Sequence, residues 1–174
     1  MTRLQMINYF TIGGVTIDDT VSQDGQLIYA AAGGNALYSA IGARLWSEGV
    51  GIASCIGTDY PEKYLKAMMD GGLDLSGIRR TDGPSLHLWI LYEQDGSRQI
   101  IPQKVSEDFV DCLDPIPTQI PQPYLDASMA HLSATGFDAQ QKIAKYLHQQ
   151  NLPISYDITQ ASMPSDGAEF GSLD

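Results

Sequence analysis

Apolar runs that alternate with helix-like patterns are the feature of this sequence that most constrains its fold. Residues 6–15 and 50–56 are rich in Ile, Val, Tyr and Phe, as in strands that are largely buried in a sheet. Between them, apolar residues recur every four positions from 35 to about 49, which predicts an amphipathic helix. A second helix through Tyr64 and Met68 follows. This order predicts an α/β fold with a Rossmann-like, doubly wound, mainly parallel sheet, which binds ligands beyond the carboxyl ends of its strands.

The second half of the chain adds a hairpin to this alternation. Asp95-Gly96 lies between two β-prone runs within 85–102, which is a strong hairpin signal. Four prolines within 114–123 predict an irregular surface connection. A strand, a helix and a strand are expected after it, at 129–133, 138–150 and 153–156. We therefore expect one domain over 1–159, with small-sheet strands near 20–32 and 85–102, and a loose tail at 160–174.

Three polar residues stand where the expected helices begin. Asn35 is placed to cap the first helix, and Asp59, followed by Pro61 and Glu62, has the spacing of a capping box. Asp138 has the same spacing with Gln141. We expect each of the three side chains to cap a helix.

Charge and cysteine content exclude several classes of protein. Ten Lys and Arg stand against twenty-one Asp and Glu, a formal net charge of −11, which argues against a nucleic-acid surface. Cys55 and Cys112 are far apart and form no zinc or redox motif, so we expect reduced, buried thiols and no metal site. The first fifteen residues have neither a secretory nor a membrane-spanning pattern, and we expect a cytoplasmic protein without membrane contact.

Asp18 and the Gly33-Gly34-Asn35 turn are the candidate binding residues. Asp18 follows the first expected strand, where a carboxylate can accept hydrogen bonds from two neighbouring hydroxyls, although aspartate also closes ordinary turns. The paired glycines before a helix allow a ligand to approach the backbone, or they form a plain turn. The segment lacks the Gly-Lys-Ser/Thr of a P-loop and does not satisfy G-x-G-x-x-G.

These segments, taken in order, resemble the ribokinase-type (PfkB) carbohydrate kinase family over nearly the whole chain. The resemblance rests on Gly13-Gly14-Val-Thr-Ile-Asp18, Gly33-Gly34-Asn35 with the Ala-rich helix after it, Ile56-Gly57-Thr58-Asp59, the hairpin turn Asp95-Gly96-Ser97-Arg98, and the later strands at 129–133 and 154–157. It implies that the hairpin belongs to a β-sheet lid over a sugar pocket.

The resemblance also implies roles for particular residues. Asp18 would bind sugar hydroxyls, Gly33, Gly34 and Asn35 would line the same pocket, and Arg98 would contact the substrate or a partner's lid, unless it is simply an exposed hairpin residue. Asp59 is explained by helix capping, with a direct substrate role as the weaker alternative. The expected ligand is a small-molecule sugar or a nucleoside.

Two kinds of departure from the family pattern limit these expectations. Tyr60 stands near where members usually have a glycine, and the Asn expected two residues after Asp157 is replaced by Thr159. The Gly-Ala-Gly-Asp signature, which supplies the anion hole and the catalytic base, and the Asn-x-x-Glu linked to magnesium have no counterpart. The chain therefore resembles a truncated, N-terminal portion of the family.

Several functions stay open at this point. The resemblance implies an ATP-dependent sugar or nucleoside kinase in its complete form, with ATP and Mg²⁺ as cofactors, whereas this chain alone would bind neither and would be inactive. The alternatives are a non-catalytic sugar- or nucleoside-binding half-domain, a module that dimerises through its lid, and a degenerate product without function. Because a parallel sheet that lacks strands exposes an unpaired edge, we also expect a homo-oligomer.

Overall fold

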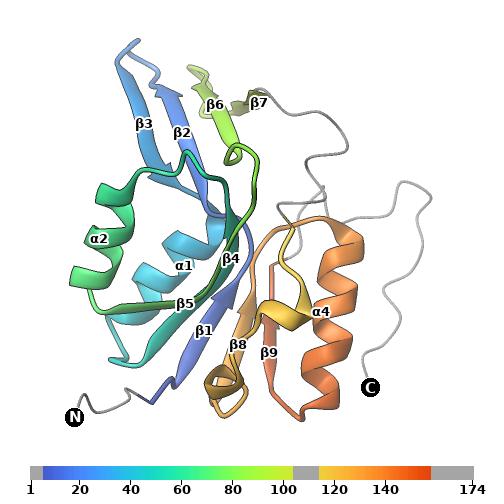
Figure 1. The fold of residues 1–174 in the computed structure, drawn as a ribbon. Helices are drawn as coiled ribbons and strands as arrows, with labels where there is room; N and C mark the ends of the chain where they lie inside the picture. The colour runs from blue at the N-terminus through green and yellow to red at the C-terminus, as the bar shows by residue number, and fades with distance from the viewer. Residues whose placement is uncertain (1–5, 104–113, 158–174) are drawn as a thin grey trace.

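Two β-sheets, one large and one small, organise the fold (Figure 1). The computed structural model describes residues 6–103 and 114–157. The large sheet has five strands, all parallel, in the order β5-β4-β1-β8-β9; their bounds are Tyr9–Ile12 for β1, Val50–Ile56 for β4, Leu73–Arg80 for β5, Met129–Leu132 for β8 and Ile154–Tyr156 for β9. The predicted parallel sheet is confirmed.

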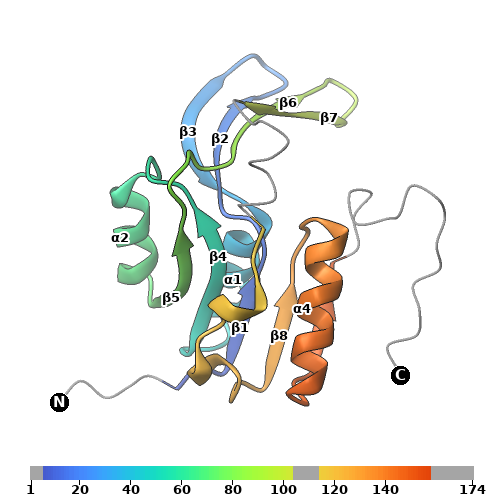
Figure 2. The ribbon, with the colours of Figure 1, turned by 45° about the vertical axis from the view of Figure 1, so that its right-hand side comes forward.

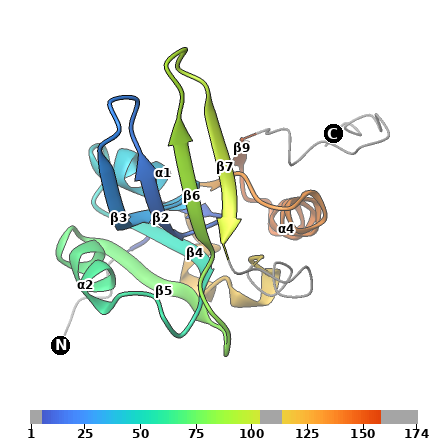
Figure 3. The same ribbon diagram turned by 90° about the horizontal axis from the view of Figure 1, so that it is seen from above.

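Helices cover both faces of the large sheet, as in a doubly wound fold (Figure 3). The bounds are Asn35–Arg44 for α1, Glu62–Asp70 for α2 and Phe137–Gln149 for α4. One apolar core lies between the sheet and α1 with α2, and it includes Leu37, Ile52 and Met68. The other lies on the α4 side and includes Phe10 and Ile143. Each helix buries one apolar stripe against the sheet, which is what the sequence periodicity predicts.

The small sheet lies above the carboxyl ends of the large sheet's strands and is called the lid here (Figure 2). It has four strands in the order β3-β2-β6-β7, with bounds Thr16–Val21 for β2, Leu27–Gly33 for β3, His87–Tyr92 for β6 and Arg98–Gln103 for β7. Strands β2 and β6 run parallel, and the two hairpins are antiparallel. The predicted hairpin is therefore confirmed, and Pro102 is accommodated because β7 is an edge strand.

The first strand differs from its predicted extent. The sequence pattern predicts one strand over 6–15 that stops before Asp18, but β1 ends at Ile12 and β2 carries Asp18 and Asp19 within the lid. Two acidic residues are tolerated in a strand because each carboxylate accepts a hydrogen bond from a neighbouring group. The chain thus passes from the large sheet into the lid through Gly13 and Gly14.

Strand β5, at the edge of the large sheet, was not predicted. Its central residues include Asp74 and Ser76, which reduce the apolar signal on which the prediction depends. A polar edge strand faces solvent on one side and needs fewer apolar residues than a central strand. The segment at 114–123 is irregular as predicted, with two short 3₁₀ turns, Pro117–Gln119 and Gln122–Tyr124.

The predicted helix caps are wrong in all three helices. The cap positions are Gly34, Pro61 and Gly136, and none of them makes a side-chain cap hydrogen bond. Asn35 is the first residue inside α1, and Asp138 lies in the first turn of α4. Capping-box spacing fixes a helix start only to within a residue or two, so the chain path around it decides the cap.

The cysteines, the tail and the absence of a membrane span were also predicted from the sequence. Cys55 is buried, as expected, and its thiol donates to the side-chain oxygen of Gln119 at 3.5 Å, whereas Cys112 and the tail at 160–174 lie outside the described residues. None of the helices in the described part of the chain is long and apolar enough to span a membrane.

Candidate functional site

Asp18 lies where the lid meets the large sheet. It is the third residue of β2 and pairs with Ala31 of β3 and Leu88 of β6, so its backbone is held on both sides. Its residue exposure is only 5%, and the Thr16 hydroxyl donates a hydrogen bond to its Oδ1 atom at 2.7 Å. No hydrogen bond from the described residues reaches Oδ2. The carboxylate is therefore fixed in place and keeps an accepting oxygen for another group.

The glycine turn is shaped by this carboxylate. A Cβ atom on Gly33 would lie 1.8 Å from Asp18 Oδ2, so only glycine leaves room for the carboxylate there. Gly34 has a φ of 102°, and a Cβ atom on it would lie 2.3 Å from the carbonyl oxygen of Gly14. The amide of Ala36 donates a hydrogen bond to the same Gly14 carbonyl at 3.3 Å. These contacts place the start of α1 directly beside Asp18.

Asp19, whose neighbour in sequence is Asp18, contacts the other strands of the lid. Strand β3 has an irregularity opposite Asp19, where Ala30 has a φ of 47°. The Ala30 amide donates to Asp19 Oδ1 at 2.7 Å, and the Gln103 amide donates to Oδ2 at 3.1 Å. His87 Nε2 lies 3.2 Å from Oδ2, a distance suited to an ion pair when the ring is protonated, but without the alignment of a hydrogen bond. One carboxylate thus contacts three other strands of the lid.

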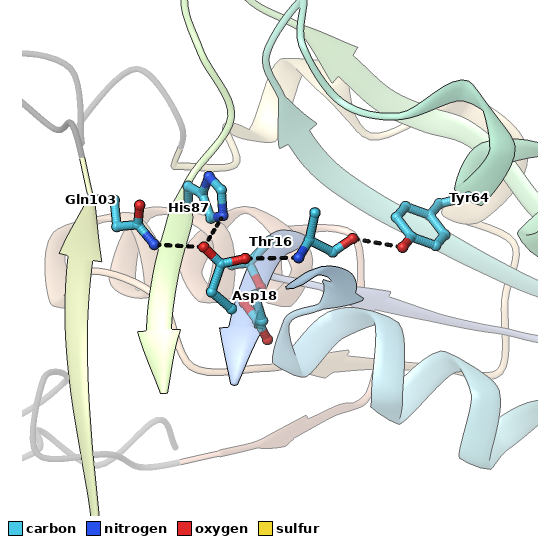
Figure 4. Close-up of polar contacts among 7 residues, drawn as sticks. Thr16, Asp18, Tyr64, His87 and Gln103 are labelled. Carbon is cyan, nitrogen blue, oxygen red and sulfur yellow. Dashed lines mark hydrogen bonds and ion pairs between the residues drawn. The ribbon is translucent and has the colours of Figure 1, made fainter. Parts of the chain in front are cut away.

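The Tyr64 hydroxyl extends this network to α2. It donates a hydrogen bond to the Ala30 carbonyl at 2.6 Å, so both backbone polar groups of Ala30 are bonded to side chains. Figure 4 shows Gln103 of β7 and His87 of β6 at one end of this line of contacts and Tyr64 of α2 at the other. The bulge at Ala30 is therefore built into the lid, and helix α2 helps to hold it.

The two neighbouring carboxyls have opposite electrostatic character. Burial raises the pKa of Asp18, and the hydrogen bond from Thr16 offsets only part of this effect. Burial acts on Asp19 in the same direction, but the hydrogen bonds from Ala30 and Gln103, together with the nearby His87 ring, outweigh it and lower the pKa of Asp19. An ionised Asp18 is therefore costly in the free protein, whereas an ionised Asp19 is stabilised by its surroundings. This contrast is expected when one carboxylate serves a ligand and the other serves the fold.

Two tyrosines, Tyr38 and Tyr60, lie near enough to Asp18 for its negative charge to act on their hydroxyls. The pKa of Tyr38 is raised by burial and by the negative charge of Asp18, and the pKa of Tyr60 is raised well above its usual range by burial, with Tyr64 and Asp18 adding to it. Tyr38 is exposed at the start of α1, whereas Tyr60 is buried and its hydroxyl has no partner among the described residues. A ligand held by Asp18 would therefore meet aromatic surface as well as backbone.

The structure brings four of the five predicted site residues together. Gly33 lies against the Asp18 carboxylate, Gly34 lies against Gly14, and Asn35 follows as an exposed residue at the first position of α1. Arg98 is exposed and pairs with Tyr92 of β6. Asp18 pairs with Leu88, which lies four residues earlier on the same strand. At about 3.3 Å per residue this is roughly 13 Å along the strand, so the structure does not bring Arg98 beside Asp18.

Other residues of this region were missed by the sequence reasoning. Asp59 does not cap α2, and its Oδ1 accepts a hydrogen bond from the Ser85 amide at 2.6 Å, which ties the β4–α2 loop to the start of the lid hairpin. His87 and Gln103 carry no local sequence signal, because their importance comes from pairing in space with Asp19. Asp19 itself could have been singled out as a second acidic residue in a β-prone run.

Comparison with proteins of known sequence and structure gives consistent relatives, although no protein-family model matches. The chain is 31% identical over 154 residues to the cytidine kinase of Thermococcus kodakarensis. The matched region covers 88% of this chain and 53% of that protein. The chain thus spans about half the length of this curated relative.

Solved structures match to the same extent. The nucleoside kinase of Burkholderia thailandensis in complex with inosine aligns with a TM-score of 0.68 at 16% identity, over 86% of this chain and 52% of that one. A putative ribokinase II from E. coli in complex with ATP and Mg²⁺ aligns with a TM-score of 0.63 at 20% identity, over 87% of this chain and 52% of that one. These similarities show that the fold of the described residues is that of these kinases.

Proposed function

Because the chain belongs to the ribokinase-like (PfkB) kinase family, we propose that it carries the substrate-binding site of a kinase for nucleosides or related sugars. The observation that supports this proposal most is Asp18, a buried carboxylate at the carboxyl end of the parallel sheet, with one oxygen held by Thr16 and the other without a described donor. A carboxylate in this state is suited to accept hydrogen bonds from vicinal hydroxyls, such as those of ribose.

The surroundings of Asp18 favour a nucleoside among these substrates. Gly33 and Gly34 let a ligand approach the backbone next to the carboxylate, and Tyr38 provides an exposed aromatic ring close by. The relative from Thermococcus kodakarensis is a cytidine kinase, and the structure from Burkholderia thailandensis contains inosine. We therefore propose a ribose moiety on Asp18, with the base toward the aromatic side chains and the lid above it.

ATP and Mg²⁺ belong to this proposal only for the complete kinase. The related E. coli protein has been solved with both. Within 6–103 and 114–157, no three His, Cys, Asp or Glu side chains gather in an arrangement that could hold a metal ion. A second candidate is a half-domain that binds the substrate without catalysing its phosphorylation.

A ligand panel tests the binding proposal. Cytidine, inosine, ribose and fructose are added to the chain, and its thermal unfolding is followed. A ligand present at a hundred times its dissociation constant stabilises the folded state by about 2.7 kcal/mol, which is readily detected. Stabilisation by nucleosides above that by free sugars supports a nucleoside site, and no response to any of the four refutes the proposal. ADP release in the presence of Mg-ATP and the bound ligand then separates the kinase from the binding half-domain.

A further inference from the structure

The pleat of the lid strands places Asp18 and Asp19 on opposite faces of the small sheet. Successive side chains of a strand point to opposite faces, so Asp18 shares a face with Thr16, whose hydroxyl donates to the Asp18 carboxylate. Asp19 lies on the other face, where it contacts His87 and Gln103. A ligand on the Asp18 carboxylate therefore meets only the first of these two faces.

Register pairing identifies the other side chains on the face of Asp18. Asp18 pairs with Leu88 of β6, so Ile90 and Tyr92, at alternate positions of that strand, lie on the same face. Ile90 pairs in turn with Ile100 of β7. Tyr92 is 39% exposed and Ile100 is 50% exposed. We refer to Leu88, Ile90, Tyr92 and Ile100 as the apolar strip, which leads away from the carboxylate along the lid.

Tyr38 of α1 adjoins the far end of the apolar strip. It lies in the first turn of α1, where its amide donates to the Gly34 carbonyl at 3.2 Å, and it is 61% exposed. Burial raises the pKa of Tyr38, and the charges of Asp18 and of an ionised Tyr92 raise it further, so the Tyr38 hydroxyl lies within electrostatic reach of both. Two accessible aromatic rings, one from α1 and one from the lid, are thus neighbours in the region of the carboxylate.

We infer that Tyr38 and Tyr92 hold the nucleobase of the substrate, while Asp18 holds its ribose. The inference rests on the proposed function, because it takes the ribose to lie on Asp18. A nucleoside has hydroxyls on its sugar and a flat aromatic base beyond them, which matches a carboxylate followed by exposed aromatic rings. Tyr60, the other tyrosine near Asp18, is only 2% exposed and offers no ring face to a ligand.

Distances along β6 agree with this placement. Ile90 and Tyr92 lie roughly 7 and 13 Å along the strand from Leu88, the residue that pairs with Asp18. A tyrosine side chain leans along its strand, so the Tyr92 ring can reach back toward a base whose ribose is on the carboxylate. The apolar strip would then lie along the base, with Tyr38 on the α1 side of it.

Aromatic contacts of this kind select for the presence of a base more than for its identity. Every base has a π face, and stacking on an aromatic side chain contributes about fivefold or more to affinity whichever base is stacked. We therefore expect cytidine and inosine to bind within about tenfold of each other, and a larger difference would contradict this tolerance. A riboside that lacks a base should bind at least about fivefold more weakly than either.

Titration of the full chain with cytidine and with methyl β-D-ribofuranoside, which carries a methoxy group in place of the base, tests the inference. Calorimetry measures the first affinity, and chemical-shift titration measures the second if it is weak. Tyr38→Leu and Tyr92→Leu should each weaken cytidine binding at least about fivefold and leave that of the riboside within about twofold. The matched control is Tyr29→Leu, because Tyr29 is a 66% exposed lid residue whose ring lies against Trp89, the partner of Asp19 on the other face.

Further variants separate loss of the ring from loss of the fold. Tyr38→Phe and Tyr92→Phe keep the ring and should bind cytidine as the unmodified chain does. Since Tyr29, Tyr38 and Tyr92 are exposed, all these variants should melt at the temperature of the unmodified chain. Unchanged cytidine affinity in both Tyr38→Leu and Tyr92→Leu, or equal losses for cytidine and the riboside, would overturn the inference.

Asp18→Asn distinguishes failure of this inference from failure of the proposed function. If Asp18→Asn weakens both ligands while Tyr38→Leu and Tyr92→Leu weaken neither, the ribose site stands and the base contacts are refuted. If cytidine does not bind to the unmodified chain, or if Asp18→Asn changes the affinity for neither ligand, the proposed function fails and the inference fails with it.

Discussion

Replacing Asp19 by alanine should destabilise the protein more than any other single change to an acidic residue of the lid. Asp19 is 6% exposed and accepts hydrogen bonds from the Ala30 amide and from Gln103, with His87 close to the same oxygen. Gln103 and His87 are only half-buried and can turn toward water. The Ala30 amide cannot, because the bulge fixes its direction.

The magnitude follows from these contacts. A buried donor that loses its acceptor costs about 1–3 kcal/mol, and a hydrogen bond to a charged group contributes about 1.5–3 kcal/mol. With partial recovery by Gln103 and His87, we expect Asp19→Ala to lower the free energy of unfolding by about 2–4 kcal/mol. This is a large share of the 5–15 kcal/mol that is usual for a domain.

Urea unfolding followed by circular dichroism measures this loss, with two matched variants. Asp19→Asn keeps an oxygen that can accept from the Ala30 amide and should lose about half as much stability. Asp126→Ala removes an exposed carboxylate and should leave the unfolding midpoint in place. A loss below about 0.5 kcal/mol for Asp19→Ala, the usual range of surface substitutions, would refute the proposed role of Asp19.

The lowered pKa of Asp19 adds a pH dependence. The carboxyl binds protons less readily in the folded protein than in the unfolded chain. Its contribution to stability is therefore complete above the unfolded pKa of about 3.9 and is lost as the pH falls through the lower, folded pKa. The unmodified chain and Asp19→Asn should thus differ at neutral pH and converge in strong acid.

Three further predictions concern the site and its surroundings. Gly33→Ala should cost about 1–3 kcal/mol in urea unfolding, because its Cβ atom would lie 1.8 Å from Asp18 Oδ2; unchanged stability would mean that the carboxylate is not held there. Asp18→Asn should be more stable than the unmodified chain at pH 7, because burial raises the pKa of the Asp18 carboxyl and makes its ionised form costly in the folded protein. This advantage should disappear below about pH 4, where the carboxyl is neutral in both the folded and the unfolded chain. If burial did not raise that pKa, melting curves recorded against pH would show a constant difference between the two proteins. Tyr60→Phe should raise the melting temperature, because the buried hydroxyl has no partner among the described residues, and a lower one would point to a partner for that hydroxyl.

The elements that could be predicted from the sequence are those with a strong local pattern. Strand β4 is buried along its whole length, and α4 has one apolar stripe, so both were predicted within a residue or two. The hairpin of β6 and β7 was found because Asp95-Gly96 marks its turn. Strand β5 was missed because its polar residues hide an edge strand that only pairing with β4 makes regular.

The candidate site likewise contains residues that the sequence could predict and residues that it could not. Asp18 and Gly33 were identified from a resemblance, and the structure adds the physical reason, which is that the carboxylate occupies the space where a Cβ atom of residue 33 would lie. Asp19, His87 and Gln103 belong to a network across strands that are up to 84 residues apart in the chain. No local pattern can predict such a network, because it exists only once the lid has formed. The capping predictions failed for a related reason, since neighbouring loops rather than spacing decided where each helix starts.

Calorimetric titration of cytidine into the unmodified chain and into Asp18→Asn tests the central claim most directly. We expect one cytidine to bind per chain, and Asp18→Asn to bind it at least about tenfold more weakly, because a charged acceptor of the ribose hydroxyls is lost. Asp126→Ala, which changes a distant exposed carboxylate, should bind as the unmodified chain does. Equal affinity of the unmodified chain and Asp18→Asn would contradict the assignment of Asp18 as the residue that holds the substrate.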